Sequence, residues 1–283
     1  MAIIIDGKAI SREIRAELKE ETLRLKDEKG IVPGLAVILM GEDPASQVYV
    51  RHKENACADA GFLSRMVRLP AATPEKTLLE LIQILNKDRQ IHGILVQLPL
   101  PGHISFDAVT EAIDPRKDVD GFHPLNVGRL FSGNPWHRAC TPTGIMELLD
   151  RSAIGIEGKE AVIVGRSNIV GKPLALMLLA RHATVTVCHT RTRNLAEVTR
   201  RAEILIAAAG KPEMILADMV RDGAAVIDVG INRLANGRLV GDVAFAECAA
   251  KAAYITPVPG GVGVMTIAML MKNTCEAARR ACF

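Results

Sequence analysis

Short apolar runs alternate with longer amphipathic segments along this chain, and this alternation limits the fold more than any other feature. In the first half, residues 35–40 suit a buried strand, 63–69 and 93–97 read as further strands, and the segments that begin at Pro44 and Thr73 read as helices. The order strand, helix, strand is typical of a parallel sheet that is covered by helices. We therefore predict an α/β fold.

A second alternating series follows in the other half of the chain. We predict strands over 161–164, 184–188, 204–208, 224–229 and 252–255, and helices over 173–181, 195–201, 213–220 and from about 265. Residues 102–141 are rich in turn formers and are the expected crossing between domains. The predicted domains are an N-terminal α/β domain over 1–120, with a mostly parallel sheet and the C-terminal helix 265–283, and a Rossmann-like domain over 121–264.

The composition narrows the classes of function. The chain has 283 residues, a net charge of +3 and 49% hydrophobic residues, so it can fill large cores and carries too little charge to imply nucleic acid or a membrane as partner. Its apolar N-terminus is too short for a signal peptide or a spanning helix. The six Cys include no Cys-x-x-Cys pair, and no His pair has metal-ligand spacing. We expect a soluble cytoplasmic protein with free thiols and no metal.

Tyr49 and Lys53 form a pair in the predicted helix that Pro44 opens. Side chains four residues apart share one face of a helix, and a phenol beside an amine is a plausible acid/base unit. The alternative is packing, with a surface lysine covering a half-buried tyrosine. The pair alone does not decide between these readings.

A glycine-containing loop joins the first strand of the second series to its helix. Gly165 ends the strand and Gly171 begins the helix, and a strand, a turn and a helix N-terminus together form an anion site. The spacing differs from G-x-G-x-x-G, so a plain tight turn explains the glycines equally well.

The residues after the second strand favour a phosphorylated cofactor. A dinucleotide fold normally has an acid there that binds the ribose hydroxyl, but this chain has His189-Thr190-Arg191-Thr192-Arg193. An arginine suits a ribose 2′-phosphate, and Arg166 with Ser167 could meet the same group. This pattern predicts NADP rather than NAD; two solvated arginines on a surface loop are the alternative.

Two further glycine loops suit the close approach of a flat ring. Gly230 precedes Ile231 at the end of a predicted strand, and Gly260 with Gly261 precedes the last helix. A hydride donor and acceptor must stack closely, so glycine-lined edges are what such a reaction needs. Each loop alone is only a turn.

Six motifs occur in a fixed order along nearly the whole chain: Tyr49 with Lys53, Val96-Gln97-Leu98-Pro99-Leu100-Pro101, Asp118-Val119-Asp120-Gly121-Phe122, Gly165-Arg166-Ser167, Gly230-Ile231-Asn232-Arg233 and Pro257-Val258-Pro259-Gly260-Gly261-Val262-Gly263. As a set they resemble the bifunctional methylenetetrahydrofolate dehydrogenase/methenyltetrahydrofolate cyclohydrolase family of the FolD type. The resemblance implies oxidation of 5,10-methylenetetrahydrofolate with NADP and hydrolysis of the product to 10-formyltetrahydrofolate, in one-carbon metabolism and purine biosynthesis. It also implies a folate cleft between the two domains and a homodimer formed through the second domain.

The resemblance further implies roles for single residues. Lys53 would transfer the proton, Gln97 would hydrogen-bond and tune it, Tyr49 would stack on the folate, and Asp120 would anchor the pterin. Leu98, Pro99, Gly260 and Gly261 would border the substrate, and the residues expected to contact NADP are Gly165, Arg166, Ser167, Thr190, Arg191 and Ile231. Thr190 stands where many members have Ser, and Val264 stands where Pro is expected, which puts the conformation of that loop in question.

The reaction itself is consistent with one lysine in two roles. Water attack on a methenyl carbon requires a proton acceptor and later a donor, and a lysine with a lowered pKa can serve as both. Gln97 is a neutral partner, whereas a carboxylate there would hold the lysine charged.

Two alternatives remain at this point. The Tyr-x-x-x-Lys pair also occurs in short-chain NADP carbonyl reductases, but there it follows the glycine loop, whereas here it precedes Gly165 by more than a hundred residues. A non-catalytic nucleotide-sensing protein on a Rossmann frame is the second, because fold does not fix function.

Overall fold

The computed structural model describes residues 2–281, and the chain divides into two compact units. One unit comprises residues 1–12 and 141–266 and is called the six-stranded unit below. The other comprises residues 13–140 and 267–283 and is called the three-stranded unit. This division differs from the predicted domains at three segments, residues 1–12, 121–140 and 265–266, each of which lies in the other unit.

The three-stranded unit contains the first predicted series. Its elements are most of α1 (Gly7–Lys29), β2 (Gly34–Met40), α2 (Pro44–Asp59), β3 (Leu63–Leu69), α3 (Glu75–Lys87), β4 (Gly93–Val96), α4 (Phe106–Ala112), α5 (Pro124–Phe131) and most of α10 (Val262–Arg280). The strands are parallel in the order β3-β2-β4, which confirms the predicted parallel sheet.

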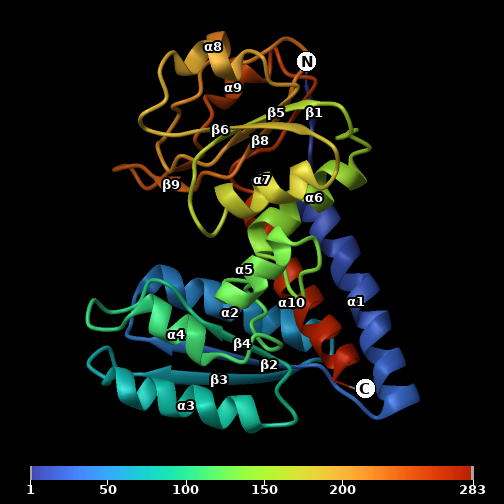
Figure 1. Ribbon diagram of the computed structural model, residues 1–283, viewed down its shortest axis with the longest axis vertical. Helices are drawn as coiled ribbons and strands as arrows, with labels where there is room; N and C mark the ends of the chain where they lie inside the picture. The colour runs from blue at the N-terminus through green and yellow to red at the C-terminus, as the bar shows by residue number, and fades with distance from the viewer. Residues whose placement is uncertain (1, 282–283) are drawn as a thin grey trace. The chain divides into compact units, whose positions relative to one another are not determined.

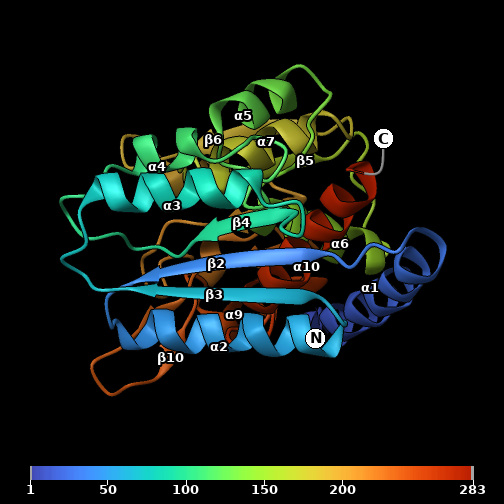
Figure 2. The ribbon, with the colours of Figure 1, turned by 90° about the horizontal axis from the view of Figure 1, so that it is seen from below.

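Both faces of this sheet are covered, as its apolar strands require. Every residue of β2 is buried, and alternate residues Ala36, Ile38 and Met40 pack in one core with α3 and α4. The helix α2 lies on the opposite face (Figure 1, Figure 2). Asp43 caps α2 by accepting a hydrogen bond from the Ser46 N–H at 2.7 Å, so the helix that carries Tyr49 and Lys53 starts at a defined point.

The six-stranded unit contains the second series. Its elements are β1 (Ile3–Ile4), α6 (Cys140–Arg151), β5 (Glu160–Val164), α7 (Gly171–Leu179), β6 (Thr184–Cys188), α8 (Leu195–Thr199), β7 (Ile204–Ala207), the 3₁₀ turn η1 (Ala217–Met219), β8 (Ala225–Asp228), β9 (Asn232–Arg233), β10 (Leu239–Val240), α9 (Phe245–Cys248) and β11 (Tyr254–Ile255). The parallel sheet has the order β1-β11-β8-β7-β5-β6. Helices α8 and α9 cover one face, and α6 and α7 the other (Figure 1).

The strand order places a change of direction between β5 and β7. The chain runs from β5 outward to β6 and then returns to the other side of β5. In sheets of this kind, ligands bind outside the carboxyl ends of the strands at this point. The Rossmann-like prediction is therefore confirmed, and it identifies the edge of the sheet where a nucleotide site belongs.

Two predictions about elements need correction. The predicted helix over 213–220 is wrong, because the N–H groups of Glu213 and Ile215 donate to the carbonyls of Gly241 and Asp242, which leaves only η1. The segment 102–141 is not merely a connection, since it contains α4 and α5. The apolar N-terminus forms β1, which pairs with β11. Within residues 2–281, no helix is both long and apolar enough to cross a bilayer.

Candidate active site

Lys53 and Gln97 meet in the three-stranded unit. Lys53 projects from α2, and its Nζ donates a hydrogen bond to Gln97 Oε1 at 2.8 Å, just beyond the end of β4. Gln97 Nε2 donates to the Leu98 carbonyl at 2.7 Å, and a carbonyl can only accept. The amide is therefore oriented with its oxygen toward the lysine. The structure thus brings these two predicted site residues together.

The surroundings of Lys53 favour its neutral form. The residue is only 8% exposed, and burial lowers the pKa of its amine, while the charge of Asp120 opposes this shift. The Gln97 oxygen carries no charge, so it can accept a hydrogen bond from the amine in either protonation state. A buried amine whose pKa is lowered and whose acceptor is neutral can both take up and release a proton.

Asp120 lies close enough to Lys53 for the two charges to interact. Burial raises the pKa of the Asp120 carboxyl to about 6, the positive charge of Lys53 opposes the shift, and neighbouring Asp118 adds to it. Asp118 is fixed separately, since it accepts hydrogen bonds from the N–H groups of Gly121 and His123 and from Asn126 Nδ2. Asp118 thus shapes the loop that carries Asp120.

Tyr49, Leu98 and Pro99 leave surface available beside the Lys53–Gln97 pair. Tyr49 lies one turn before Lys53 on α2 and is 40% exposed, so its ring can serve as a platform. Pro99 is exposed and is joined to the half-buried Leu98 by a cis peptide bond. The tyrosine and the lysine therefore differ in burial, and within residues 2–281 no hydrogen bond joins them.

A buried amide that the sequence did not reveal holds this region together. Asn273 on α10 donates to the carbonyls of Val119 and Arg138 at 2.8 and 3.0 Å, and the Cys140 thiol donates to the same Val119 carbonyl. Val119 separates Asp118 from Asp120. Because these partners lie about 130–150 residues apart in the chain, no local pattern could have indicated the contact.

In the six-stranded unit, Gly165 marks the start of the nucleotide loop. Its φ is 139°, and a Cβ atom there would overlap the Ala208 carbonyl oxygen. Ser167 closes the loop, because its Oγ accepts from the Val170 N–H at 3.1 Å and from the Gly171 N–H at 3.3 Å. The loop itself thus supplies the hydrogen-bond acceptor for two N–H groups at the start of α7. Among residues 2–281, the backbone N–H groups of 166–169 have no hydrogen-bond partner.

The parallel register brings Thr190 and Arg191 to the same edge. Val164 pairs with Cys188, and the Gly165 N–H donates to the Cys188 carbonyl at 2.9 Å, so the loops after β5 and β6 leave the sheet together. His189 Nδ1 accepts from the Arg191 N–H at 3.0 Å and shapes the turn. Thr190 and Arg191 are exposed, and within the described chain the Arg191 guanidinium has no ion-pair partner.

Ile231 and the Pro259–Gly263 loop complete this half of the site. Ile231 follows β8 and is 48% exposed, and a Cβ added at Gly263 would lie 3.0 Å from its side chain. Gly260 has a φ of 108°, and a Cβ at Gly261 would lie 2.6 Å from the Pro257 carbonyl oxygen. Val264 is the third residue of α10, where an N–H has no partner within the helix, so the loop forms without proline there.

These residues fit a dinucleotide phosphate. The cradle at Gly165 has no room for a side chain, the N–H groups of 166–169 are available to anions, and arginines 166 and 191 supply positive charge. No acid follows β6 to repel a 2′-phosphate. Across residues 2–281, no group of three or more His, Cys, Asp or Glu is arranged to hold a metal ion.

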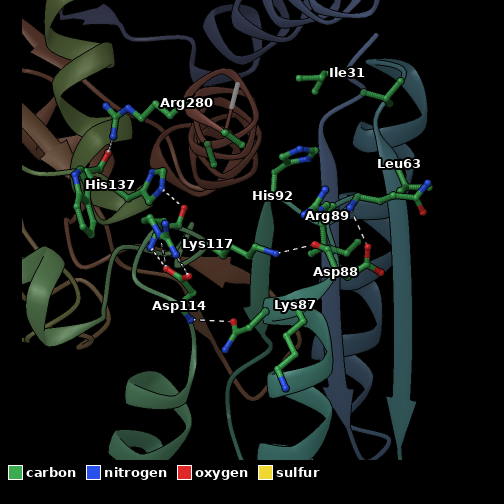
Figure 3. A pocket seen from close by; sticks show the side chains of 18 of the residues that line it. Ile31, Leu63, Lys87, Asp88, Arg89, His92, Asp114, Lys117, His137 and Arg280 are labelled. Atoms are coloured by element: carbon green, nitrogen blue, oxygen red, sulfur yellow. Dashed lines mark hydrogen bonds and ion pairs between the residues drawn. The ribbon is translucent and has the colours of Figure 1, made fainter. Parts of the chain in front are cut away.

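A large pocket of the three-stranded unit lies away from Lys53. It has a volume of about 1020 Å³ and is bordered by residues that precede β2, β3 and β4, so it is at the amino edge of the sheet. Lys117 points to the end of α3 and donates to the carbonyls of Leu85 and Asp88 at 3.1 and 2.8 Å, and Arg280 donates to the Trp136 carbonyl at 2.7 Å (Figure 3). Since α1, α3 and α10 all end here, these cations neutralise helix C-termini. The pocket is not an evident anion site.

Comparison with known proteins gives matches over the whole chain. A family profile described as "Tetrahydrofolate dehydrogenase/cyclohydrolase, catalytic domain" matches residues 5–120, and "Tetrahydrofolate dehydrogenase/cyclohydrolase, NAD(P)-binding domain" matches residues 139–282. The "Bifunctional protein FolD" of Moorella thermoacetica is 64% identical over 279 residues, which cover 99% of each chain. That of Pelobacter propionicus is 59% identical over 280 residues, again covering 99% of each.

Solved structures agree with these matches. The bifunctional enzyme FolD, methylenetetrahydrofolate dehydrogenase/cyclohydrolase, from Campylobacter jejuni superposes with a TM-score of 0.97 at 52% identity, covering 99% of both chains. The Trypanosoma brucei dehydrogenase-cyclohydrolase, in complex with NADP cofactor and an inhibitor, gives a TM-score of 0.95 at 43% identity, covering 99% of this chain and 98% of that one.

Proposed function

This chain belongs to the tetrahydrofolate dehydrogenase/cyclohydrolase family, and from that premise we propose how its two units divide the work. The enzyme oxidises 5,10-methylenetetrahydrofolate to 5,10-methenyltetrahydrofolate with NADP and hydrolyses that product to 10-formyltetrahydrofolate. The hydrogen bond of 2.8 Å between the buried Lys53 amine and the Gln97 amide is the observation that supports this division most directly.

The three-stranded unit supplies the acid/base chemistry. Neutral Lys53 accepts a proton from the water that attacks the methenyl carbon, and the resulting ammonium returns it to the nitrogen that leaves. Gln97 holds the amine in place through both states. Tyr49 offers its exposed ring for stacking, Leu98 and Pro99 border the substrate, and Asp120 anchors the pterin ring through its carboxyl.

The six-stranded unit binds the cofactor. When bound there, NADP would supply the acceptor for the hydride of the folate methylene carbon. The turn at Gly165 lets the backbone approach the phosphates, while Arg166, Ser167, Thr190 and Arg191 meet the 2′-phosphate. Ile231 packs against the flat ring, and Gly260 with Gly261 leaves the substrate free to approach.

An absorbance assay tests the function directly. With methylenetetrahydrofolate as substrate, NADP should give rapid formation of NADPH, and NAD should give a much lower rate. Added methenyltetrahydrofolate should lose its own absorbance as it is hydrolysed. Tight NADP binding without turnover of either folate would instead favour a nucleotide-sensing protein.

We further propose a cytoplasmic homodimer that is formed through the six-stranded unit and has no nucleic-acid partner. The strand β6 is at the edge of the sheet, and Val187 on it and Leu179 on α7 are 37% and 60% exposed. An exposed strand edge with apolar side chains is a surface that a second copy can cover. Light scattering on the purified protein should give twice the chain mass, and Val187→Lys should lower it.

A further inference from the structure

A buried carboxylate in the six-stranded unit holds two loops beside the proposed cofactor site. Asp242 follows β10 and is 0% exposed. Within residues 2–281, it forms no salt bridge with a lysine, arginine or histidine. A buried carboxylate without a cation must be stabilised by hydrogen bonds.

Four N–H donors converge on the Asp242 carboxylate. Ala209 and Gly210 donate their backbone N–H groups to Oδ2 at 2.6 and 2.8 Å, and Lys211 donates its backbone N–H to Oδ1 at 2.9 Å. The fourth donor is Asn232 Nδ2, which reaches Oδ1 at 2.9 Å. Residues 209–211 form the loop after β7, whereas Asn232 follows β8. One side chain therefore ties together the loops at the carboxyl ends of two neighbouring strands.

Both loops border residues that are expected to contact the cofactor. Ala208, which begins the loop after β7, packs so closely on the turn at Gly165 that a Cβ there would overlap its carbonyl oxygen. Asn232 directly follows Ile231. The loop after β7 also lies at the change of direction between β5 and β7, where nucleotides bind in such sheets.

Asp242 is itself held by the end of β8. Asp228 Oδ1 accepts the Asp242 N–H at 2.9 Å, and Asp228 Oδ2 accepts the Val243 N–H at 3.0 Å. Asp228 is the last residue of β8, a strand in the interior of the sheet. The Asp242 carboxylate is therefore fixed by an interior strand of the sheet, and it in turn holds the two loops.

We propose that Asp242 is a positioning residue for NADP, which holds the loops 209–211 and 231–232 in the shape that binds the dinucleotide. The identity of the nucleotide rests on the proposed function, but the role of the carboxylate does not. Asp242→Asn replaces one acceptor oxygen with an NH₂ group, which then faces two N–H donors that it cannot satisfy. The loops should shift while the sheet beneath them remains.

Calorimetric titration of the full-length protein with NADP tests the proposal, because it needs no turnover. Asp242→Asn should weaken NADP binding by about 10-fold or more, as expected for hydrogen bonds to a charged group. Asn232→Ala removes one donor and should weaken binding by about 2- to 10-fold. In the dehydrogenase assay the change should fall mainly on the KM for NADP, while hydrolysis of methenyltetrahydrofolate, which uses Lys53, should stay within error.

The matched control is Asp222→Asn, which makes the same exchange in the same unit at a side chain that is 85% exposed. It should leave the Kd for NADP unchanged. Unaltered NADP affinity in folded Asp242→Asn, with only a lower Tm, would assign a purely structural role and overturn the proposal. If Asp242→Asn does not fold, unchanged NADP affinity in Asn232→Ala overturns it. Failure of the wild-type protein to oxidise methylenetetrahydrofolate would count against the proposed function alone.

Discussion

Two basic side chains assigned to the chemistry, Lys53 and Arg191, have opposite surroundings. Lys53 is 8% exposed and donates to a neutral amide. The Arg191 side chain is exposed, and within the described chain only the backbone N–H of this residue is held, by His189 Nδ1. Burial lowers the pKa of the lysine amine, so its charge depends on pH, whereas the Arg191 guanidinium is open to solvent and to anions. The comparison separates a group that must exchange a proton from one that only has to attract an anion.

The largest effect should come from removing the buried amine of Lys53. Lys53→Ala should lower cyclohydrolase activity by about 10²- to 10⁴-fold, the usual contribution of a general acid/base. The Kd for NADP should stay unchanged, because the cofactor residues lie in the other unit. Lys87→Ala, at an exposed lysine, is the matched control. Normal hydrolysis after Lys53→Ala would show that Lys53 does not exchange the proton, and its contrast with Arg191 would then have no functional meaning.

The next effect concerns the neutral partner of Lys53. In Gln97→Glu, a carboxylate would stabilise the ammonium and raise its pKa, so less neutral lysine would be present at neutral pH. The pH profile of hydrolysis should move upward by about 1–3 units, with a matching loss of rate at pH 7. Gln97→Met, which removes the acceptor without adding charge, is the control. A profile that does not move in Gln97→Glu would show that Lys53 is not the titrating group.

A smaller effect is expected at the exposed cation. Arg191→Ala should weaken NADP by about 10-fold and NAD much less, since only NADP has a 2′-phosphate for the guanidinium to bind. Raising the salt concentration should reduce the difference, because an exposed charge is screened. Arg221→Ala, at the amino edge of the same sheet, controls for the loss of a positive charge. Equal weakening of both nucleotides would contradict a 2′-phosphate role.

The smallest effect should appear where a loop of the six-stranded unit enters α10. Val264→Pro should raise the free energy of unfolding by about 0.4–1 kcal/mol, because proline restricts the unfolded chain and the third residue of a helix needs no N–H. The carbonyl of Val264, which accepts from Ser11 Oγ at 3.2 Å, is kept. Thermal unfolding followed by circular dichroism measures the change. A lower Tm would indicate that the loop requires the present backbone angles.

Elements that depend on a local sequence pattern were predictable. Contacts between segments that lie far apart in the sequence were not. The alternation of strands and helices gave the two parallel sheets, because the pattern of buried residues within each strand is local. The prediction for residues 213–220 was wrong, although the spacing of the apolar residues in this segment suits a helix. The segment instead pairs with residues 241–243, which no local pattern indicates.

The same distinction holds within the site. The lysine, the glutamine and the cofactor loops were named from their motifs, and the structure places Lys53 against Gln97. Asn273 and Asp242 were missed because each acts through backbone groups far away in the sequence. A backbone N–H or carbonyl leaves no trace in the residue types of the segment that supplies it, so such partners become visible only in three dimensions.

The placement of β1 has a consequence for the order of folding. Ile3 and Ile4 pair with β11 at residues 254–255, so the two strands are separated by about 250 residues of sequence. Strand β1 must therefore wait until the residues between the two strands have been made, and contacts of such long sequence separation slow folding. Neither unit corresponds to one continuous stretch of the gene, so a fragment that ends before residue 254 would leave the edge of the larger sheet unfinished.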